Sequence, residues 1–128
     1  MLDMIENLLG QFNAAWSNQD LDAVMACFAE DAVYFASVGP SPGERAEGHT
    51  DIRHLVERMF ELDGDAATHI DRINILKDAA FWTWRYTRPE HPEEIGCDFF
   101  EFGDGLITLK DAYRKTFLLP ERQMEPTQ

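Results

Sequence analysis

The stretch that decides the fold is GCDFFEFGDGLITLKDAYRK, which runs from Gly96 to Lys115. Asp104-Gly105 within it predicts a two-residue β-turn, because a type I′ turn needs positive φ at both central positions. Side chains alternate along a strand, so one face of this hairpin collects three opposed pairs. These are Phe102 with Ile107, Phe100 with Leu109, and Asp98 with Asp111. The other face carries Phe99, Glu101, Thr108, Lys110 and Ala112.

The hairpin therefore predicts two carboxylates among aromatic rings. Two carboxyl groups in a weakly solvated site do not both ionise cheaply, so one keeps its proton and donates a hydrogen bond at neutral pH. Asp98 is the predicted proton donor and Asp111 the predicted base. The alternative is a structural ion pair with Arg72, Arg85 or Lys115. A β-bulge would decide whether Asp111 or Arg114 faces the pocket.

Helical spacing of apolar residues predicts a first helix over 2–17, a short second helix capped by Asp20, and a third beginning at Thr50. Strands are predicted over 32–38, 68–76 and 81–87, and the Pro/Gly cluster 39–43 is a predicted loop. In the second strand pair, Ile75 is expected opposite Trp82, Ile73 opposite Trp84, Asp71 opposite Tyr86, and His69 opposite Arg88. Helices followed by a mostly antiparallel sheet indicate an α+β domain.

Length and charge exclude several classes of partner. A chain of 128 residues is expected to form one domain. Its net charge of −13 argues against nucleic acid and against acidic membrane surfaces. Cys27 and Cys97 are expected to be reduced thiols, and no apolar run is long enough to span a bilayer. The histidines are scattered without zinc-ligand spacing, so no metal is expected. We expect a soluble, cytoplasmic protein.

Three phrases carry a family resemblance: FNAAWSNQDLDAVMACFAEDAVY (12–34), GHTDIRHLVERMF (48–60) and DFFEFGDGLITLKDAYRK (98–115). Together they resemble the nuclear transport factor 2-like superfamily, which includes SnoaL-like polyketide cyclases and ketosteroid isomerases. The resemblance implies a cone-shaped, strongly curved, mostly antiparallel sheet packed on three helices and enclosing a pocket. It implies one domain over 1–119 with a flexible tail over 120–128, and a homodimer through the outer sheet face.

The resemblance also places catalytic positions. The general-base aspartate of ketosteroid isomerases would fall on Ala36 and their oxyanion-hole tyrosine on Phe12, so both groups are missing here. Their second oxyanion-hole acid would fall on Asp98, which is present. One aspartate of the superfamily's epoxide hydrolases resembles Asp111 in place, but Trp84 and Tyr86 stand where the other groups would lie.

Histidines offer a further interpretation, in which His69 or His54 acts with Asp111 as in scytalone dehydratases. His69 could also bond Asp71 or belong to a polar rim, and His54 is expected to face solvent.

The predicted function is that of a cofactor-independent acid/base enzyme, an isomerase, cyclase or dehydratase acting on a small hydrophobic carbonyl or ring compound. Asp98, Asp111 and His69 are the predicted catalytic residues. The aromatic residues could equally form an ordinary hydrophobic core without a ligand. The alternative function is therefore a non-catalytic ligand-binding or dimerisation module. Epoxide hydrolysis is the third possibility. The predicted substrate-binding residues are Phe12, Trp16, Tyr34, Met59, Trp82, Trp84, Tyr86, Phe100 and Tyr113.

Overall fold

The computed structural model of the chain describes residues 2–115, which form three helices and one six-stranded sheet. The elements follow one another as α1 (Leu2–Ser17), α2 (Leu21–Ala26), β1 (Phe28–Phe35), β2 (Arg45–Glu47), α3 (Gly48–Asp63), β3 (Ala67–Ile75), β4 (Ala79–Thr87), β5 (Glu94–Gly103) and β6 (Leu106–Arg114). The predicted α+β class is confirmed. The predicted tail over 120–128 lies outside the described residues.

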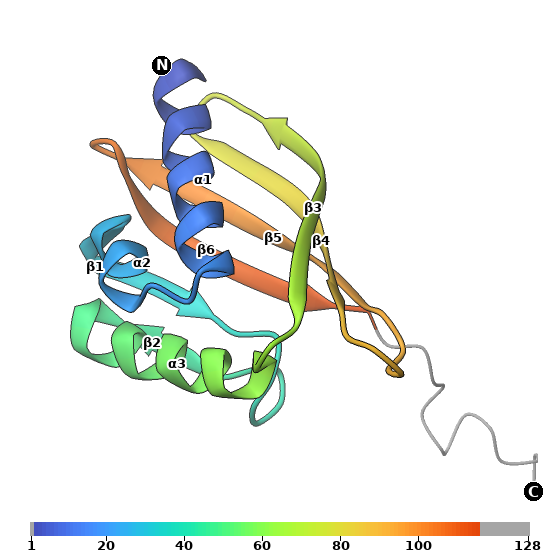
Figure 1. Cartoon of the computed structure of the whole chain (residues 1–128). Coiled ribbons are helices and arrows are strands. Elements are labelled where there is room, and N and C mark those ends of the chain that lie inside the picture. The colour runs from blue at the N-terminus through green and yellow to red at the C-terminus, as the bar shows by residue number, and fades with distance from the viewer. Residues whose placement is uncertain (1, 116–128) are drawn as a thin grey trace, which may run out of the picture.

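The sheet is curved and all three helices lie on its inner side (Figure 1). The strand order is β2-β1-β6-β5-β4-β3, and the neighbours pair antiparallel except for β1 with β6, which run parallel. Helix α1 contacts β3 at one end of the sheet, and α3 contacts β1 and β2 at the other. This arrangement leaves the inner faces of β4, β5 and β6 directed at the helices, which is where a pocket can form.

Local sequence signals explain the helices. The apolar stripe of α1 buries Ile5, Leu9 and Phe12 against the sheet, as its helical spacing predicts. The Asp20 side chain accepts a hydrogen bond from the Ala23 amide and caps α2. Helix α3 begins at Gly48, close to the predicted start near Thr50, but Thr50 is not its N-cap, because Glu47 precedes the helix without a side-chain cap. Glycine suits this start since its φ is +85°.

The predicted turn at Asp104-Gly105 is confirmed, because φ is 51° at Asp104 and 77° at Gly105. The predicted register holds only near that turn. Phe102 pairs with Ile107, but a bulge follows and Phe100 pairs with Lys110 instead of Leu109. One extra residue in a strand reverses the faces of all residues beyond it.

That reversal corrects the central expectation of the hairpin. Asp98 lies opposite Ala112, and Asp111 lies opposite Phe99 on the outer face. The inner face of β6 instead presents Lys110, Ala112 and Arg114, which all line the pocket. The Asp98–Asp111 pair therefore does not exist in this structure.

The pairing of β3 with β4 also differs from the prediction, for two reasons. Near the turn the register is displaced by two residues, so that Ile75 pairs with Ala80 and Ile73 with Trp82, and a second bulge shifts it by one more between Ile70 and Arg72. His69 consequently pairs with Arg85 rather than Arg88, and its two neighbours on β3, Thr68 and Ile70, face the pocket. Side chains alternate along a strand, so His69 faces outward.

Aromatic rings fill the space between α1 and the sheet. The Phe12 ring lies 5.7 Å from Phe28 and 5.7 Å from Phe100, both edge to face, and 6.2 Å from Trp82. Edge-to-face pairs of this kind stabilise a core beyond their buried area, by about 0.5–1.5 kcal/mol each. Phe12 is thus the centre of a rigid aromatic cluster beside the pocket.

Gly96 provides a test of how tightly β5 packs against Trp84. A Cβ at Gly96 would lie 2.3 Å from the Trp84 ring and 2.2 Å from the Tyr113 carbonyl oxygen. We expect Gly96→Ala to lower the free energy of unfolding by about 1–3 kcal/mol through overpacking, measured by urea denaturation. Gly10→Ala is the matched control, because α1 has nothing within 4 Å of that position. It should stabilise the helix by up to about 1 kcal/mol, and equal stability of the two variants would contradict this packing.

Candidate functional site

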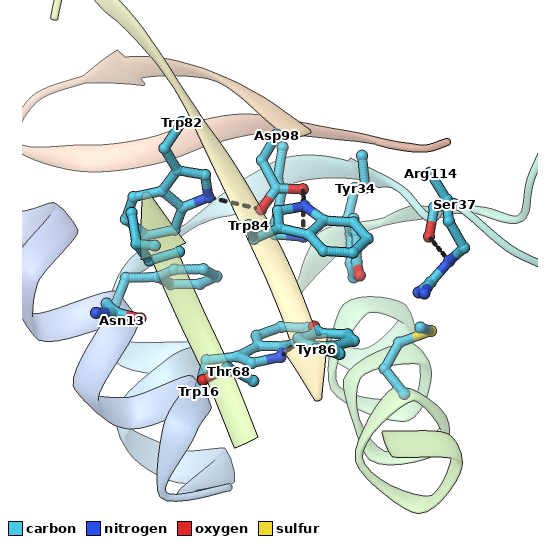
Figure 2. A pocket seen from close by; sticks show the side chains of 15 residues that line it. Asn13, Trp16, Tyr34, Ser37, Thr68, Trp82, Trp84, Tyr86, Asp98 and Arg114 are labelled. Atoms are coloured by element: carbon cyan, nitrogen blue, oxygen red, sulfur yellow. Dashed lines mark hydrogen bonds and ion pairs between the residues drawn. The ribbon is translucent and has the colours of Figure 1, made fainter. Parts of the chain in front are cut away.

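A pocket lies between the inner face of the sheet and helices α1 and α3 (Figure 2). Its cavity volume is about 30 Å³, enough for one or two water molecules. A larger ligand therefore requires the aromatic walls to move apart. The lining residues are Phe12, Asn13, Trp16, Tyr34, Ser37, Met59, Thr68, Ile70, Trp82, Trp84, Tyr86, Asp98, Lys110, Ala112 and Arg114.

Asp98 is the buried carboxyl group of this pocket and is 5% exposed. The Trp82 indole nitrogen donates to Oδ2 at 2.8 Å, and the Trp84 indole nitrogen donates to Oδ1 at 3.2 Å. The Lys110 ammonium donates to Oδ1 at 3.5 Å. Indole and ammonium groups only donate hydrogen bonds, so both carboxyl oxygens of Asp98 act as acceptors.

Strand geometry assembles this group from three strands. Trp82 and Trp84 stand two residues apart on β4 and so face the same way. Trp82 pairs directly with Asp98 on β5, and Ala112 on β6 pairs with Asp98 from the other side. Ala112 is small, so the Lys110 side chain on the same face of β6 can extend to Asp98.

Lys110 is as buried as its partner, with 4% of its side chain exposed against 7% for Asp98. Its nitrogen lies 4.3 Å from the centre of the Tyr34 ring and 4.8 Å from that of Trp16. Both rings attract the ammonium through cation–π interactions. Burial lowers the pKa of Lys110, and the neighbouring Asp98 acts in the opposite direction.

Two tyrosines complete the inner wall. The Trp16 indole donates to the Tyr86 hydroxyl at 3.2 Å. Burial raises the pKa of Tyr34, with a smaller contribution from the negative charge of Asp98, and burial likewise raises the pKa of Tyr86. Both phenols therefore hold their protons firmly and can act as hydrogen-bond donors to a ligand.

Asp63, at the end of α3, is a second buried carboxyl group and is 3% exposed. Burial raises its pKa, and Arg114 together with hydrogen bonds from Trp16 and Tyr86 acts in the opposite direction. Asp63 is not among the residues predicted for the site, because its position next to the pocket's aromatic wall depends on how the end of α3 packs against Trp16 and Tyr86.

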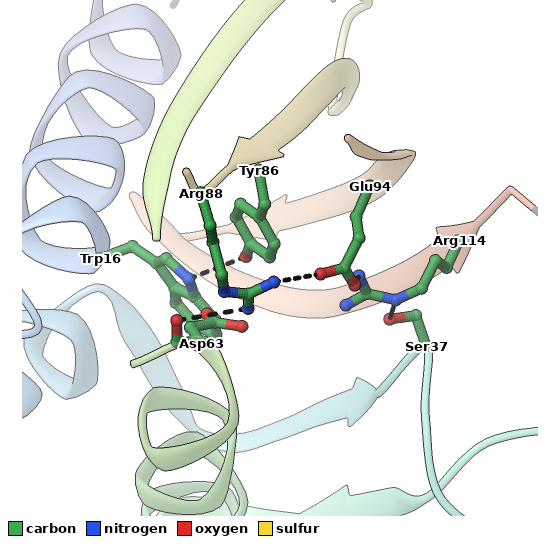
Figure 3. Close-up of polar contacts among 7 residues, drawn as sticks. All are labelled: Trp16, Ser37, Asp63, Tyr86, Arg88, Glu94 and Arg114. Carbon is green, nitrogen blue, oxygen red and sulfur yellow. Dashed lines mark hydrogen bonds and ion pairs between the residues drawn. The ribbon is translucent and has the colours of Figure 1, made fainter. Parts of the chain in front are cut away.

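An ion-pair cluster of Arg88, Glu94 and Arg114 adjoins the pocket through Arg114, which belongs to the lining (Figure 3). Arg114 stacks on the wall, with its guanidinium carbon 4.9 Å from the centre of the Trp84 ring. Its Nε donates to the Ser37 hydroxyl at 3.2 Å, and its Nη1 donates to Glu94 at 2.5 Å. We call these three residues the rim cluster.

The structure places most of the predicted substrate-binding residues in the lining. These are Phe12, Trp16, Tyr34, Met59, Trp82, Trp84 and Tyr86. Phe100 is fully buried behind them and packs edge to face on Trp82, with 5.0 Å between ring centres. The placement of Tyr113 is wrong: it is 59% exposed on the outer face, where its hydroxyl donates to Asp111.

Of the predicted catalytic residues, only Asp98 reaches the pocket. Asp111 lies on the outer face because of the bulge in β6, and His69 bonds Thr87 at 3.0 Å on the outer face of β4. Asp71, the proposed partner of His69, pairs instead with Arg85. His54 is exposed on α3, as expected.

Lys110 is the main residue that sequence reasoning missed. Strict alternation placed it on the outer face with Thr108 and Ala112. No signal in the sequence marks it, because the bulge that turns Lys110 and Arg114 toward the pocket is visible only in the strand pairing.

Residues 2–115 contain no group of three or more His, Cys, Asp or Glu side chains placed to hold a metal ion. In the same part of the chain, no helix is both long enough and apolar enough to cross a membrane.

Comparisons with known proteins agree with this fold. A model of the SnoaL-like domain family matches residues 9–110. A search of curated proteins finds no match. Among solved structures, an NTF2-like protein of unknown function from Mesorhizobium loti is similar with a TM-score of 0.77 and 20% identity, covering 89% of this chain and 93% of that one.

Two other similar solved structures are described as candidate enzymes. A candidate ketosteroid isomerase from Kribbella flavida has a TM-score of 0.76 and 20% identity, covering 98% of this chain and 91% of that one. A candidate polyketide cyclase from Sinorhizobium meliloti has a TM-score of 0.71 and 20% identity, covering 83% of this chain and 93% of that one. At these identities the likeness establishes the fold alone.

The buried Asp98–Lys110 pair predicts a non-additive effect on stability. Asp98→Leu leaves the Lys110 charge buried without its partner, so we expect a loss of about 3–5 kcal/mol in the free energy of unfolding. The double variant Asp98→Leu with Lys110→Met should recover much of that loss, because no uncompensated charge remains. Urea denaturation of the wild type, both single variants and the double variant gives the coupling energy. Simple additivity would show that the two groups do not interact.

Proposed function

Because the chain belongs to the SnoaL-like domain family, we propose that it is a cofactor-independent acid/base enzyme of the isomerase, cyclase or dehydratase type. Its substrate would be a small hydrophobic carbonyl or ring compound. The observation that carries this proposal is the enclosure of one carboxyl group, Asp98, and one amine, Lys110, within 3.5 Å of each other in an aromatic pocket. A buried amine whose pKa is lowered by burial, as that of Lys110 is, is typical of functional sites when it lies in such a pocket.

The hydrogen bonds favour Asp98 as a proton acceptor rather than the proton donor expected from the sequence. A carboxylate offers about four lone-pair sites, and Trp82, Trp84 and Lys110 occupy three of them. The remaining site can take a proton from a carbon next to a carbonyl group. The two indoles hold the carboxylate in one orientation, which a general base requires.

Lys110 and the phenols supply the electrophilic half of the reaction. When Asp98 removes the proton, negative charge develops on the carbonyl oxygen of the substrate. The Lys110 ammonium and the Tyr34 hydroxyl face the same cavity and would stabilise that oxygen. Return of the proton from Asp98 to a different carbon gives isomerisation. Attack of the enolate carbon on a second carbonyl of the same molecule gives cyclisation, in which the C=O π bond breaks and the proton held by Asp98 passes to the resulting alkoxide.

A non-catalytic ligand-binding module remains the second candidate function. The positions that correspond to the isomerase base and tyrosine are Ala36 and Phe12, which are 2% and 1% exposed and carry no ionisable group. In that case Asp98 and Lys110 would be a structural ion pair that shapes the cavity.

Proton exchange on a simple ring ketone separates these two functions. We expect the protein to accelerate deuterium uptake at the carbons beside the carbonyl of 2-tetralone in D₂O, followed by proton NMR. Asp98→Asn should slow the catalysed exchange by about 100-fold or more, because the base is lost. Asp111→Asn is the matched control, since that carboxyl group lies on the outer face and should leave the rate unchanged.

Tryptophan fluorescence provides the second readout, because Trp16, Trp82 and Trp84 all line the pocket. Quenching by 2-tetralone without any accelerated exchange would indicate the binding module. Equal exchange rates for Asp98→Asn and the wild type would rule out Asp98 as the base.

For the assembly, we propose a homodimer through the outer sheet face. Phe81 on β4 pairs across the strands with Phe99 on β5, and Phe81 and Tyr113 are 40% and 59% exposed on this face. Exposed aromatic residues on a sheet face are typical of interfaces.

Light scattering in solution should therefore give twice the chain mass of 14.7 kDa. Phe81→Glu should shift the protein to the monomer, whereas Lys77→Glu, an exposed change in the loop between β3 and β4, should not. A monomeric wild type would contradict the proposed interface.

A further inference from the structure

We propose that the ligand of this pocket is an anion, namely a hydrophobic carbonyl compound that carries a carboxylate group, and that Arg114 binds this carboxylate. The inference rests on the proposed function for the reacting half of the ligand. The inference that the ligand carries a carboxylate does not depend on the proposed function and is argued from the contacts of Arg114 and the rim cluster.

Arg114 is oriented as a ligand-binding arginine. Its planar guanidinium lies over Trp84 and Tyr86, with its carbon 4.9 Å and 5.7 Å from the two ring centres. Its Nε and Nη1 donate to Ser37 and Glu94. Within residues 2–115, Nη2 makes no hydrogen bond, so this nitrogen is available to a carboxylate in the pocket that Arg114 lines.

Glu94 can release Arg114 without becoming unpaired. The Arg88 Nη1 donates to the second carboxyl oxygen of Glu94 at 2.6 Å, and the Arg88 Nη2 donates to the Asp63 carbonyl oxygen at 3.3 Å. The Glu94 side chain is 36% exposed, so water weakens its attraction to Arg114. Two arginines share one carboxylate in the rim cluster. A ligand carboxylate would give each arginine its own partner.

The charge of the lining supports an anionic ligand. The whole chain carries a net charge of −13, which repels anions in general. The charged residues of the lining, however, are Lys110 and Arg114 against Asp98 alone. Counting the rim cluster and Asp63 as well, three cationic side chains (Lys110, Arg88 and Arg114) stand against three carboxyl groups (Asp98, Glu94 and Asp63). Burial raises the pKa of Asp63, which favours its uncharged form, so the site is far less acidic than the protein as a whole.

Trp84 contacts both residues that the proposed ligand would reach. Its indole nitrogen bonds Asp98 at 3.2 Å, and Arg114 stacks over its ring. A flat ring ligand beside this indole would therefore present its reactive carbon to Asp98 and its carboxylate to Arg114.

A matched pair of ligands tests this inference. The probes are 6-carboxy-2-tetralone and its methyl ester, which share the ring ketone and differ in the charge. We expect the acid to bind the wild type at least 10-fold more tightly than the ester, measured by tryptophan fluorescence quenching. Arg114→Gln should remove that preference, so that the acid and the ester bind this variant with equal affinity.

A second variant should move the affinity in the opposite direction. Glu94→Gln removes the competing carboxylate, so we expect the acid to bind several-fold more tightly and the ester to bind as before. A merely structural role of the rim cluster would weaken both ligands alike. Arg85→Gln is the control arginine, because Arg85 pairs with Asp71 on the outer face and should affect neither ligand.

The outcomes distinguish failure of the anion site from failure of the proposed enzyme. Equal affinity for acid and ester in the wild type, or a preference that survives Arg114→Gln, overturns the anion site. Proton exchange on the ester together with equal affinities would leave the proposed enzyme standing and remove only the anion site. Tight, Arg114-dependent binding of the acid without proton exchange would leave the anion site standing and remove the proposed enzyme. Binding of neither probe would overturn both.

Discussion

The burial of Asp98 is the constraint on which the rest of this structure depends. A carboxyl group removed from water requires hydrogen-bond donors for both oxygens, and here they come from Trp82, Trp84 and Lys110. Each donor in turn needs an apolar enclosure, which the rings of Trp16 and Tyr34 provide for Lys110. One buried carboxyl group is thus satisfied by side chains from β4 and β6, and Trp16 of α1 helps to enclose its partner Lys110.

The sequence predicted the parts of the fold that follow from regular periodicity. Helix α1, the turn at Asp104-Gly105 and the inward faces of Trp82, Trp84 and Asp98 all follow from spacings of 3.6 or 2 residues. The two bulges could not be predicted, because no residue in TLKDAYR or HIDRIN demands one. Each bulge reversed the faces beyond it, which removed Asp111, Tyr113 and His69 from the pocket and brought in Lys110 and Arg114.

The chain has its family's scaffold, and its pocket places one carboxyl group, Asp98, beside one buried amine, Lys110. The resemblance found in the sequence implies that Asp98 holds the position of an oxyanion-hole acid of ketosteroid isomerases, with Ala36 and Phe12 at the positions of their base and tyrosine. A fold of this kind hosts many chemistries because side chains on the inner sheet face can change without affecting the strand pairing.

Because of the bulge in β6, the number of residues in this strand determines which of its side chains face the cavity. Removing one residue between Ile107 and Leu109 would exchange the two faces of the strand beyond that point. The cavity would then receive Leu109, Asp111 and Tyr113, and the two cations would pass to solvent. A single insertion or deletion would thus exchange two cationic side chains of the cavity for a carboxyl group and a phenol, with no substitution at all.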